Sequence, residues 1–192
     1  MTLLIHARRL SDESRPKLEA HFLSLSSDDL HLRFGTSLSK AAIADYVARI
    51  DFDRDAVFAV HDDELAIVGV AHLARNPDAA ELGLSVAPGF RGKGIGSALF
   101  RRAHEHARNH LIRALFMHCL AENETMMRIA RKAGMKIVIH PGEAQAFLDL
   151  PPWSPATIAQ ELIEDQAALC DFALKSQVLA SRGVIETTRL QK

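Results

Sequence analysis

The sequence predicts a mixed α/β fold of the α+β kind, and three observations support this. Helical spacing of apolar residues dominates the first fifty residues, a group of apolar runs separated by short polar turns follows, and helix-like and strand-like segments alternate afterwards. With 192 residues, 48% of them hydrophobic, the chain is long enough for a single core. We expect one domain over residues 1–153, a helical extension of it over 154–182, and a tail over 183–192.

The amino-terminal part predicts one strand and three helices. Alternation over about residues 2–9 favours a strand, and Ser11 with the acidic residues behind it marks the start of a helix over about 12–25. Two more helical segments follow, "SSDDLHLRF" and then "SKAAIADYVARI" over roughly 39–50. Next, "AVFAVH", "LAIVGVAHLAR" and "AELGLSVAP" are separated by polar turns and predict three successive strands in an antiparallel meander.

The second half predicts two helices between strands and a long closing helix. An i, i+4 ridge of apolar residues and small alanines predicts a helix that lies close to the sheet: Ile95, Leu99, Ala103, Ala107 and Leu111. "IRALFMHCL" then predicts a strand, Asn123 and Gly134 mark the ends of the next helix, and "MKIVIH" and "AQAFLDL" predict two strands. Ser154 and Pro155 open a helix to about residue 181, one side of which is apolar.

Composition excludes several classes of partner. The formal net charge of -1 indicates no general attraction to nucleic acid or to an anionic membrane, so we expect neither as a partner. The first apolar run is too short for a secretory signal, and no run approaches the length of a membrane span, which favours a cytoplasmic protein. Cys119 and Cys170 stand far apart and predict neither a disulfide framework nor a zinc site.

His106 and His110 have the i, i+4 spacing that can bind a metal ion. They lack the H-E-x-x-H order of a zinc protease, and a solvated helix face is the better interpretation. We therefore expect no metal site.

The stretch "RGKGIG", residues 91–96, lies between a predicted strand and a predicted helix. It is not a P-loop, because Lys93 is followed by Gly94 rather than by Ser or Thr. A dinucleotide fingerprint is weak, because Ser97 stands where a glycine is needed. Glycines nevertheless let backbone N–H groups converge, and the helix start adds the positive end of its dipole, so the stretch predicts an anion site.

The spacing Arg-x-x-Gly-x-Gly, with a strand before it and an amphipathic helix after it, resembles the acyl-CoA loop of the GNAT superfamily of N-acyltransferases. "AENETMMRIARKAGM" resembles the next signature of the family, an Asn that caps a helix ending in Gly and a large apolar residue. The resemblance covers about residues 55–140. It implies a mostly antiparallel sheet of six to seven strands with a splay between the fourth and fifth strands, helices on both faces, and an extra carboxy-terminal helix.

The resemblance also implies a site for acetyl-CoA as cosubstrate. The loop amides would hold the pyrophosphate, and the fourth strand would offer its backbone to the pantetheine arm. The residues so assigned are Leu84, Ser85, Val86, Arg91, Gly92, Lys93, Gly94, Ile95, Gly96, Ser97 and Asn123.

Direct attack by an amine on the thioester requires a base or a channel that delivers the free amine, and Glu81 is the candidate general base. It alternates with Leu82 and Leu84, so it faces away from the core helix if those residues face toward it; the alternative is an ordinary carboxylate in solvent. His118 and Glu122 are secondary candidates. One position departs from the family: Ala130 stands where many relatives place a Tyr that protonates the leaving thiolate.

These features predict an N-acetyltransferase that transfers an acetyl group from acetyl-CoA to a primary amine of an unidentified acceptor, a small molecule or a protein lysine. The alternative is a noncatalytic sensor that binds acyl-CoA or a metabolite and regulates a partner. The apolar side of the closing helix packs on its own domain, on a partner subunit in a homodimer, or against the acceptor site.

Overall fold

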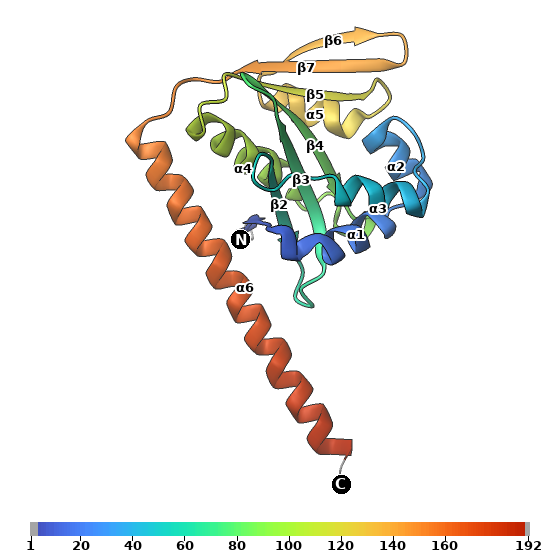
Figure 1. Ribbon diagram of the computed structural model, residues 1–192, viewed down its shortest axis with the longest axis vertical. Helices are drawn as coiled ribbons and strands as arrows, with labels where there is room; N and C mark the ends of the chain where they lie inside the picture. The colour runs from blue at the N-terminus through green and yellow to red at the C-terminus, as the bar shows by residue number, and fades with distance from the viewer. Residues whose placement is uncertain (1–3, 191–192) are drawn as a thin grey trace.

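A computed structural model describes residues 4–190 of the chain (Figure 1). In chain order the elements are β1 (Arg8–Arg9), η1 (Asp12–Ser14), α1 (Arg15–Leu23), α2 (Ser27–Phe34), α3 (Lys40–Ala48), β2 (Ala56–His61), β3 (Ile67–Arg75), β4 (Ala79–Val86), η2 (Pro88–Phe90), α4 (Ile95–Asn109), β5 (Ala114–Leu120), α5 (Glu124–Lys132), β6 (Lys136–His140), β7 (Glu143–Asp149) and α6 (Pro155–Leu190). Among the described helices none has the length and apolar character needed to cross a membrane.

Within residues 4–190, seven strands form one sheet in the order β1-β2-β3-β4-β5-β7-β6, and only β4 and β5 run parallel to each other. Their pairing is short: it joins Ala79 to Ala114, Ala80 to Leu115 and Glu81 to Phe116. Beyond Glu81 the two strands have no further pairs, although β4 continues to Val86. The mostly antiparallel seven-stranded sheet with a splay between its fourth and fifth strands is therefore confirmed.

Two apolar cores fill the two faces of this sheet. One core includes Leu82 and Leu84 of β4 together with Leu99 and Ala103 of α4. Ala103 and its neighbour one turn on, Ala107, are fully buried, so small side chains do bring α4 close to the strands. The other core joins α1 and α3 to the opposite face. Because side chains alternate along a strand, Glu81, Gly83 and Ser85 face this second side.

Three boundaries differ from the sequence prediction. β1 contains Arg8 and Arg9, whereas a strand over about 2–9 was expected, and residues 2 and 3 of that range lie outside the described residues. Among residues 4–9 only Arg8 and Arg9 pair with β2, and Ile5 packs against the first core instead. The helix α4 ends at Asn109, which leaves Leu111 69% exposed rather than on the buried ridge. The helix α6 continues to Leu190, beyond the expected end near residue 181.

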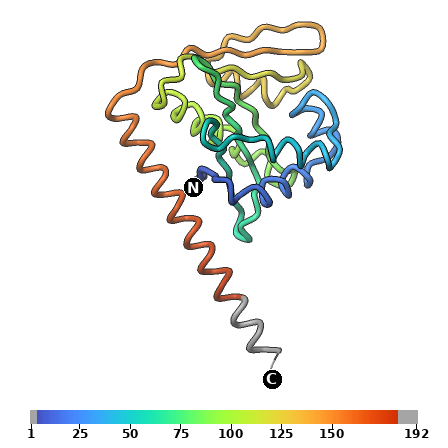
Figure 2. Tube along the Cα trace, viewed as in Figure 1, coloured from blue at the N-terminus to red at the C-terminus, as the bar shows by residue number. Residues whose placement is uncertain are grey.

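The helix α6 runs down the side of the domain and projects beyond it (Figures 1 and 2). Its Glu161 carboxylate accepts hydrogen bonds from Arg102, His106 and Asn109 of α4. Burial alone would raise the pKa of Glu161, but these hydrogen bonds hold the pKa well below its ordinary value. His106 is thus buried against α6, and the expectation of a solvated face is wrong for it.

His110 lies near this contact. One potential metal-ligand atom from each of His106, His110 and Glu161 lies within 4.8 Å of the other two. The Glu161 carboxylate, however, is already shared by three donors, one of them the Arg102 guanidinium. Hydrogen bonding between α4 and α6 accounts for the cluster.

Candidate functional site

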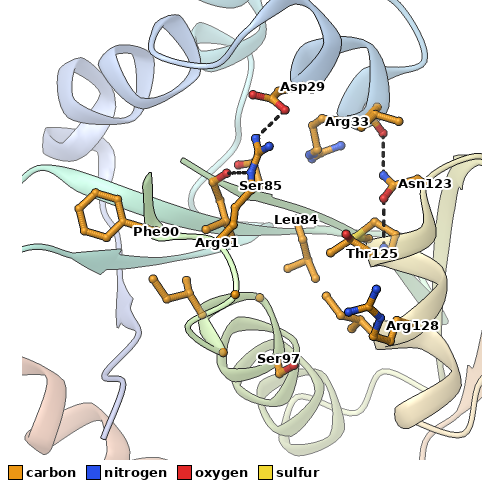
Figure 3. A pocket seen from close by; sticks show the side chains of 18 of the residues that line it. Asp29, Arg33, Leu84, Ser85, Phe90, Arg91, Ser97, Asn123, Thr125 and Arg128 are labelled. Atoms are coloured by element: carbon orange, nitrogen blue, oxygen red, sulfur yellow. Dashed lines mark hydrogen bonds and ion pairs between the residues drawn. The ribbon is translucent and has the colours of Figure 1, made fainter. Parts of the chain in front are cut away.

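A cavity of about 370 Å³ is lined by the last residues of β4, beyond its pairs with β5 (Figure 3). Residues from β4, the glycine stretch, the first turn of α4, α2 and α5 line it. Of the residues that the sequence assigned to a cosubstrate, the structure brings ten to this cavity: Leu84, Ser85, Val86, Arg91, Gly92, Gly94, Ile95, Gly96, Ser97 and Asn123. Lys93 is outside the lining, with its ammonium 4.8 Å from the centre of the Phe90 ring.

The glycine stretch turns the chain so that the start of α4 faces this cavity. Gly92 and Gly94 have φ angles of 75° and 87°, in the left-handed region that glycine adopts without strain. Gly94 precedes the helix and supplies no capping side chain. The first hydrogen bond within α4 runs from Ala98 N to Gly94 O, so the N–H groups of residues 95–97 have no acceptor within the helix. They are available to an anion.

The register of β4 shows which of its backbone groups face the gap. Ala87 N donates to Val68 O, and Ala79 O accepts from Asn76 N, so odd-numbered residues direct their main chain toward β3. Leu84 and Val86 therefore direct theirs into the gap, as expected. Ser85 differs from the expectation: its main chain is directed to β3, and only its side chain is available to the cavity.

The Ser85 hydroxyl lies 2.9 Å from His21 Nε2, and His21 Nδ1 lies 3.0 Å from Ile67 O. The carbonyl must accept, so Nδ1 carries the proton and Nε2 accepts from Ser85. Burial lowers the pKa of His21 to about 4, although the hydrogen bond to Ile67 opposes this shift. His21 is therefore neutral near pH 7 and orients Ser85.

One ion pair in the first cavity joins Arg91 to Asp29. An Arg91 guanidinium nitrogen lies 2.5 Å from Asp29 Oδ1, and Arg91 Nε donates to Val86 O (Figure 3). Burial acts to raise the pKa of Asp29, but hydrogen bonds from Arg91 and Ser26 outweigh it and lower the pKa. Arg91 is thus already paired when an anion enters this cavity, so we expect the backbone amides to carry more of the binding than this guanidinium does.

Asn123 joins two elements at the edge of the first cavity. Its carbonyl oxygen accepts from Met126 N at 3.1 Å, which caps α5, and its amide nitrogen donates to Leu32 O of α2 at 3.3 Å (Figure 3). Arg128, one turn into α5, and Lys132, the last residue of α5, also line the cavity. Neither was predicted from the sequence, although their i, i+4 spacing behind Asn123 was an available signal.

A second cavity, of about 530 Å³, is lined by residues from β3, β4, β5, β7 and the early helices. It shares Leu32 and Arg33 with the first cavity. Glu81 and His118 line it together, with His118 Nδ1 3.4 Å from Glu81 Oε1 and both side chains about half exposed. Glu122 is outside the lining and lies 4.0 Å from His31 Nε2.

Arg33 lies where the two cavities meet. A Cβ atom on Gly83 would come within 1.8 Å of an Arg33 guanidinium nitrogen, so only a glycine lets the guanidinium rest on β4. Arg33 also donates to the Tyr46 hydroxyl at 3.4 Å.

Three hydrogen-bonded polar side chains beside this cavity were not predicted from the sequence. The Tyr46 hydroxyl lies 2.7 Å from His72 Nδ1, and His72 Nε2 lies 3.1 Å from Asp55 Oδ2. Tyr46 and His72 line the second cavity, whereas the Asp55 carboxylate is buried behind them. No local pattern could have linked these residues, because they come from α3, β3 and the turn before β2.

A helix start with unpaired amides thus faces one cavity beside the splayed part of β4, and a second cavity adjoins it at Leu32 and Arg33. In a comparison with known families, residues 8–136 match the family described as acetyltransferase (GNAT) domain. The chain belongs to the GNAT acetyltransferase family.

Solved structures with the same fold include the GNAT domain of S. lividans PAT, with 22% sequence identity, 75% of this chain and 89% of that chain covered, and a TM-score of 0.65. The protein yncA from Salmonella typhimurium, solved with its cofactor acetyl-CoA, matches at 14% identity over 79% and 96% of the two chains, with a TM-score of 0.62. Spermidine N-acetyltransferase from Vibrio cholerae, in complex with CoA and spermine, matches at 18% identity over 76% and 95%, with a TM-score of 0.61. At these identities the likeness concerns the fold.

Proposed function

We propose that this protein is an N-acetyltransferase that transfers an acetyl group from acetyl-CoA directly to a primary amine. The observation that carries the proposal is the set of unpaired N–H groups at residues 95–97, which faces a cavity that opens onto the split between β4 and β5. Membership of the GNAT family supports it, as do the acetyl-CoA and CoA bound by two proteins of the same fold.

The first cavity fits the cosubstrate. Residues 95–97 would hold the pyrophosphate with their N–H groups at the positive end of α4, and hydrogen bonds to a charged group are worth about 1.5–3 kcal/mol each. Leu84 and Val86 would pair with the amide groups of the pantetheine arm as a neighbouring strand does. A main-chain N–H of β4 directed at the thioester carbonyl would stabilise the oxyanion that forms during attack.

The second cavity would receive the acceptor. Glu81 supplies a negative charge there, which an ammonium group requires. Two roles are open to this carboxylate: the general base that the sequence analysis expected, or the anion that holds the acceptor in place. Loss of the base would lower kcat, whereas loss of the binding anion would raise KM.

The sensor function remains the second candidate, and Ala130 is the observation that favours it. This residue is buried in the first core, so the position offers no proton donor to a leaving thiolate.

A thiol-release assay with acetyl-CoA and a panel of amino acids, polyamines, aminoglycosides and lysine peptides separates the two functions. We expect release that depends on at least one acceptor. Tight CoA binding without acceptor-dependent release across the panel would overturn the enzyme and favour the sensor.

A further inference from the structure

Asp55, His72 and Tyr46 are joined by two hydrogen bonds, and the donor and acceptor of each bond can be assigned. The Asp55 carboxylate accepts from Arg75 N and from His72 Nε2, both at 3.1 Å. Burial acts to raise the pKa of Asp55, but hydrogen bonds from Arg54, Arg75 and His72 lower it, so the group is ionised near neutral pH. Since Nε2 of the neutral imidazole carries the proton, Nδ1 is left to accept from the Tyr46 hydroxyl.

The ring of Tyr46 is held so that its hydroxyl borders the second cavity. Phe22 and Phe34 meet it edge to face, with ring centroids at 5.4 and 5.0 Å. The hydroxyl proton is directed to His72, and the oxygen accepts one long hydrogen bond from Arg33. The oxygen can therefore accept a further hydrogen bond from an N–H group in the cavity.

We propose that Tyr46 exchanges a proton with the acceptor amine, and that His72 and Asp55 position it and store the proton. This inference rests on the proposed function. The acceptor gives up its ammonium proton to solvent as it binds and reacts as the free amine. As the C–N bond forms, the nitrogen gives a further proton to the Tyr46 oxygen, and the Tyr46 proton passes to His72 Nδ1. Asp55 stabilises the imidazolium, as the carboxylate does in a Ser-His-Asp triad.

The same path returns the proton. When the C–S bond breaks, its electron pair leaves with the sulfur, and the proton stored on His72 passes back through Tyr46 to the thiolate. The products are then the amide and the CoA thiol, and the reaction needs no further reactant. Tyr46 thereby supplies the proton donor that Ala130 does not, and Glu81 keeps the role of holding the acceptor.

The proton path requires neutral His72, so the pKa of His72 determines how kcat depends on pH. Burial lowers the pKa of His72 below its ordinary value of 6.5; Arg33 also lowers it, while Asp55 and Glu81 raise it. Tyr46 is the other titratable group in contact with the ring, and burial raises its pKa. We expect kcat to be constant near neutral pH and to fall only below pH 6.5, as His72 gains a proton.

The test compares Tyr46→Phe with wild type on the amine of the panel that gives the fastest thiol release. Phe keeps the aromatic packing and removes only the hydroxyl, so we expect kcat to fall by about 100-fold, within the range for general acid–base catalysis, with KM and CoA affinity changed less than about two-fold. Asp55→Asn removes an interaction that raises the His72 pKa, so the decline of its residual kcat should move to lower pH. Glu81→Gln should instead raise KM.

Phe22→Leu is the matched control, because Phe22 touches Tyr46 but lines neither cavity. It should lower Tm and leave the shape of the pH profile unchanged. An active wild type with undiminished kcat in Tyr46→Phe overturns the proton path alone. An inactive wild type overturns the path together with the proposed function.

One measurement needs no acceptor. Tyr46 is the only tyrosine in the chain, so 13C labelling at the tyrosine ζ carbon gives a single resonance. We expect its shift to change as His72 titrates and to lose that change in His72→Gln. A Tyr46 chemical shift that does not change as His72 titrates would overturn the proposal.

Discussion

The two cavities present different groups to a ligand. The first offers main-chain N–H and C=O groups from one short stretch of chain, residues 84–97, and the arginine of that stretch, Arg91, is paired with Asp29. The second offers side chains that arrive from separate elements, among them Tyr46, His72 and Glu81. A backbone site depends on the path of the chain and tolerates changes of side chain, whereas a side-chain site can be lost by one substitution.

The substitution with the largest expected effect disrupts the main-chain groups of the first cavity. Gly94→Glu places a carboxylate at the start of α4 and a side chain at a φ of 87°. Because like charge would repel the pyrophosphate and displace several amide hydrogen bonds, we expect CoA affinity to fall by at least about 100-fold in a calorimetric titration.

Gly142→Glu is the control for this substitution. Gly142 has a φ of 85°, lies in the turn between β6 and β7, and has open space around it. It lines neither cavity, so the same strain and charge should leave CoA affinity within about two-fold. Equal losses in the two variants would show that strain rather than position weakens binding.

A smaller effect tests whether the cavities can be separated. Gly83→Ala forces the Arg33 guanidinium off β4, because the added Cβ would overlap it. We expect kcat/KM for the acceptor to fall by about ten-fold, a loss of about 1.4 kcal/mol, with CoA affinity nearly unchanged. Gly89→Ala, where the added carbon meets nothing within 4 Å, should change neither quantity. A parallel loss of CoA affinity in Gly83→Ala would mean that the cavities act as one.

The substitution with the smallest expected effect should strengthen CoA binding rather than weaken it. Asp29→Asn removes a negative charge from the first cavity and releases Arg91, while the amide can still cap α2 through its oxygen. We expect CoA to bind about two- to five-fold more tightly at low salt, with less gain at high salt. The neighbouring Asp28 does not line the cavity, so Asp28→Asn should have no such effect. Weaker binding in Asp29→Asn would show that the ion pair organises the loop.

This difference between the cavities also explains what the sequence could predict. The glycine stretch, the β4 edge and the Asn123 cap are local patterns, and the structure brings nearly all of them to the first cavity. The alternation of side chains along the strand was enough to identify Glu81 as a candidate. The chain from Asp55 to Tyr46 was not, because its members become neighbours only after α3 packs against β3.

The same limit applied to His106. Its i, i+4 spacing with His110 is a helix-surface pattern, and nothing local signalled that Glu161, 55 residues away, would cover it. β1 was overestimated for a related reason: alternation predicts strand conformation, but the length of a strand depends on the partner available, and β2 pairs with only two of its residues.

The contact between α4 and α6 matters for anyone who shortens this chain. The Arg102 side chain is 3% exposed and is paired with Glu161 and Asp165 of α6. Ending the chain before Pro155 would remove both counter-charges together with the helix that covers this side of α4, and would uncover Arg102 and His106. The closing helix therefore neutralises a charge inside the domain, and an expression tag or fusion partner belongs after it rather than in its place.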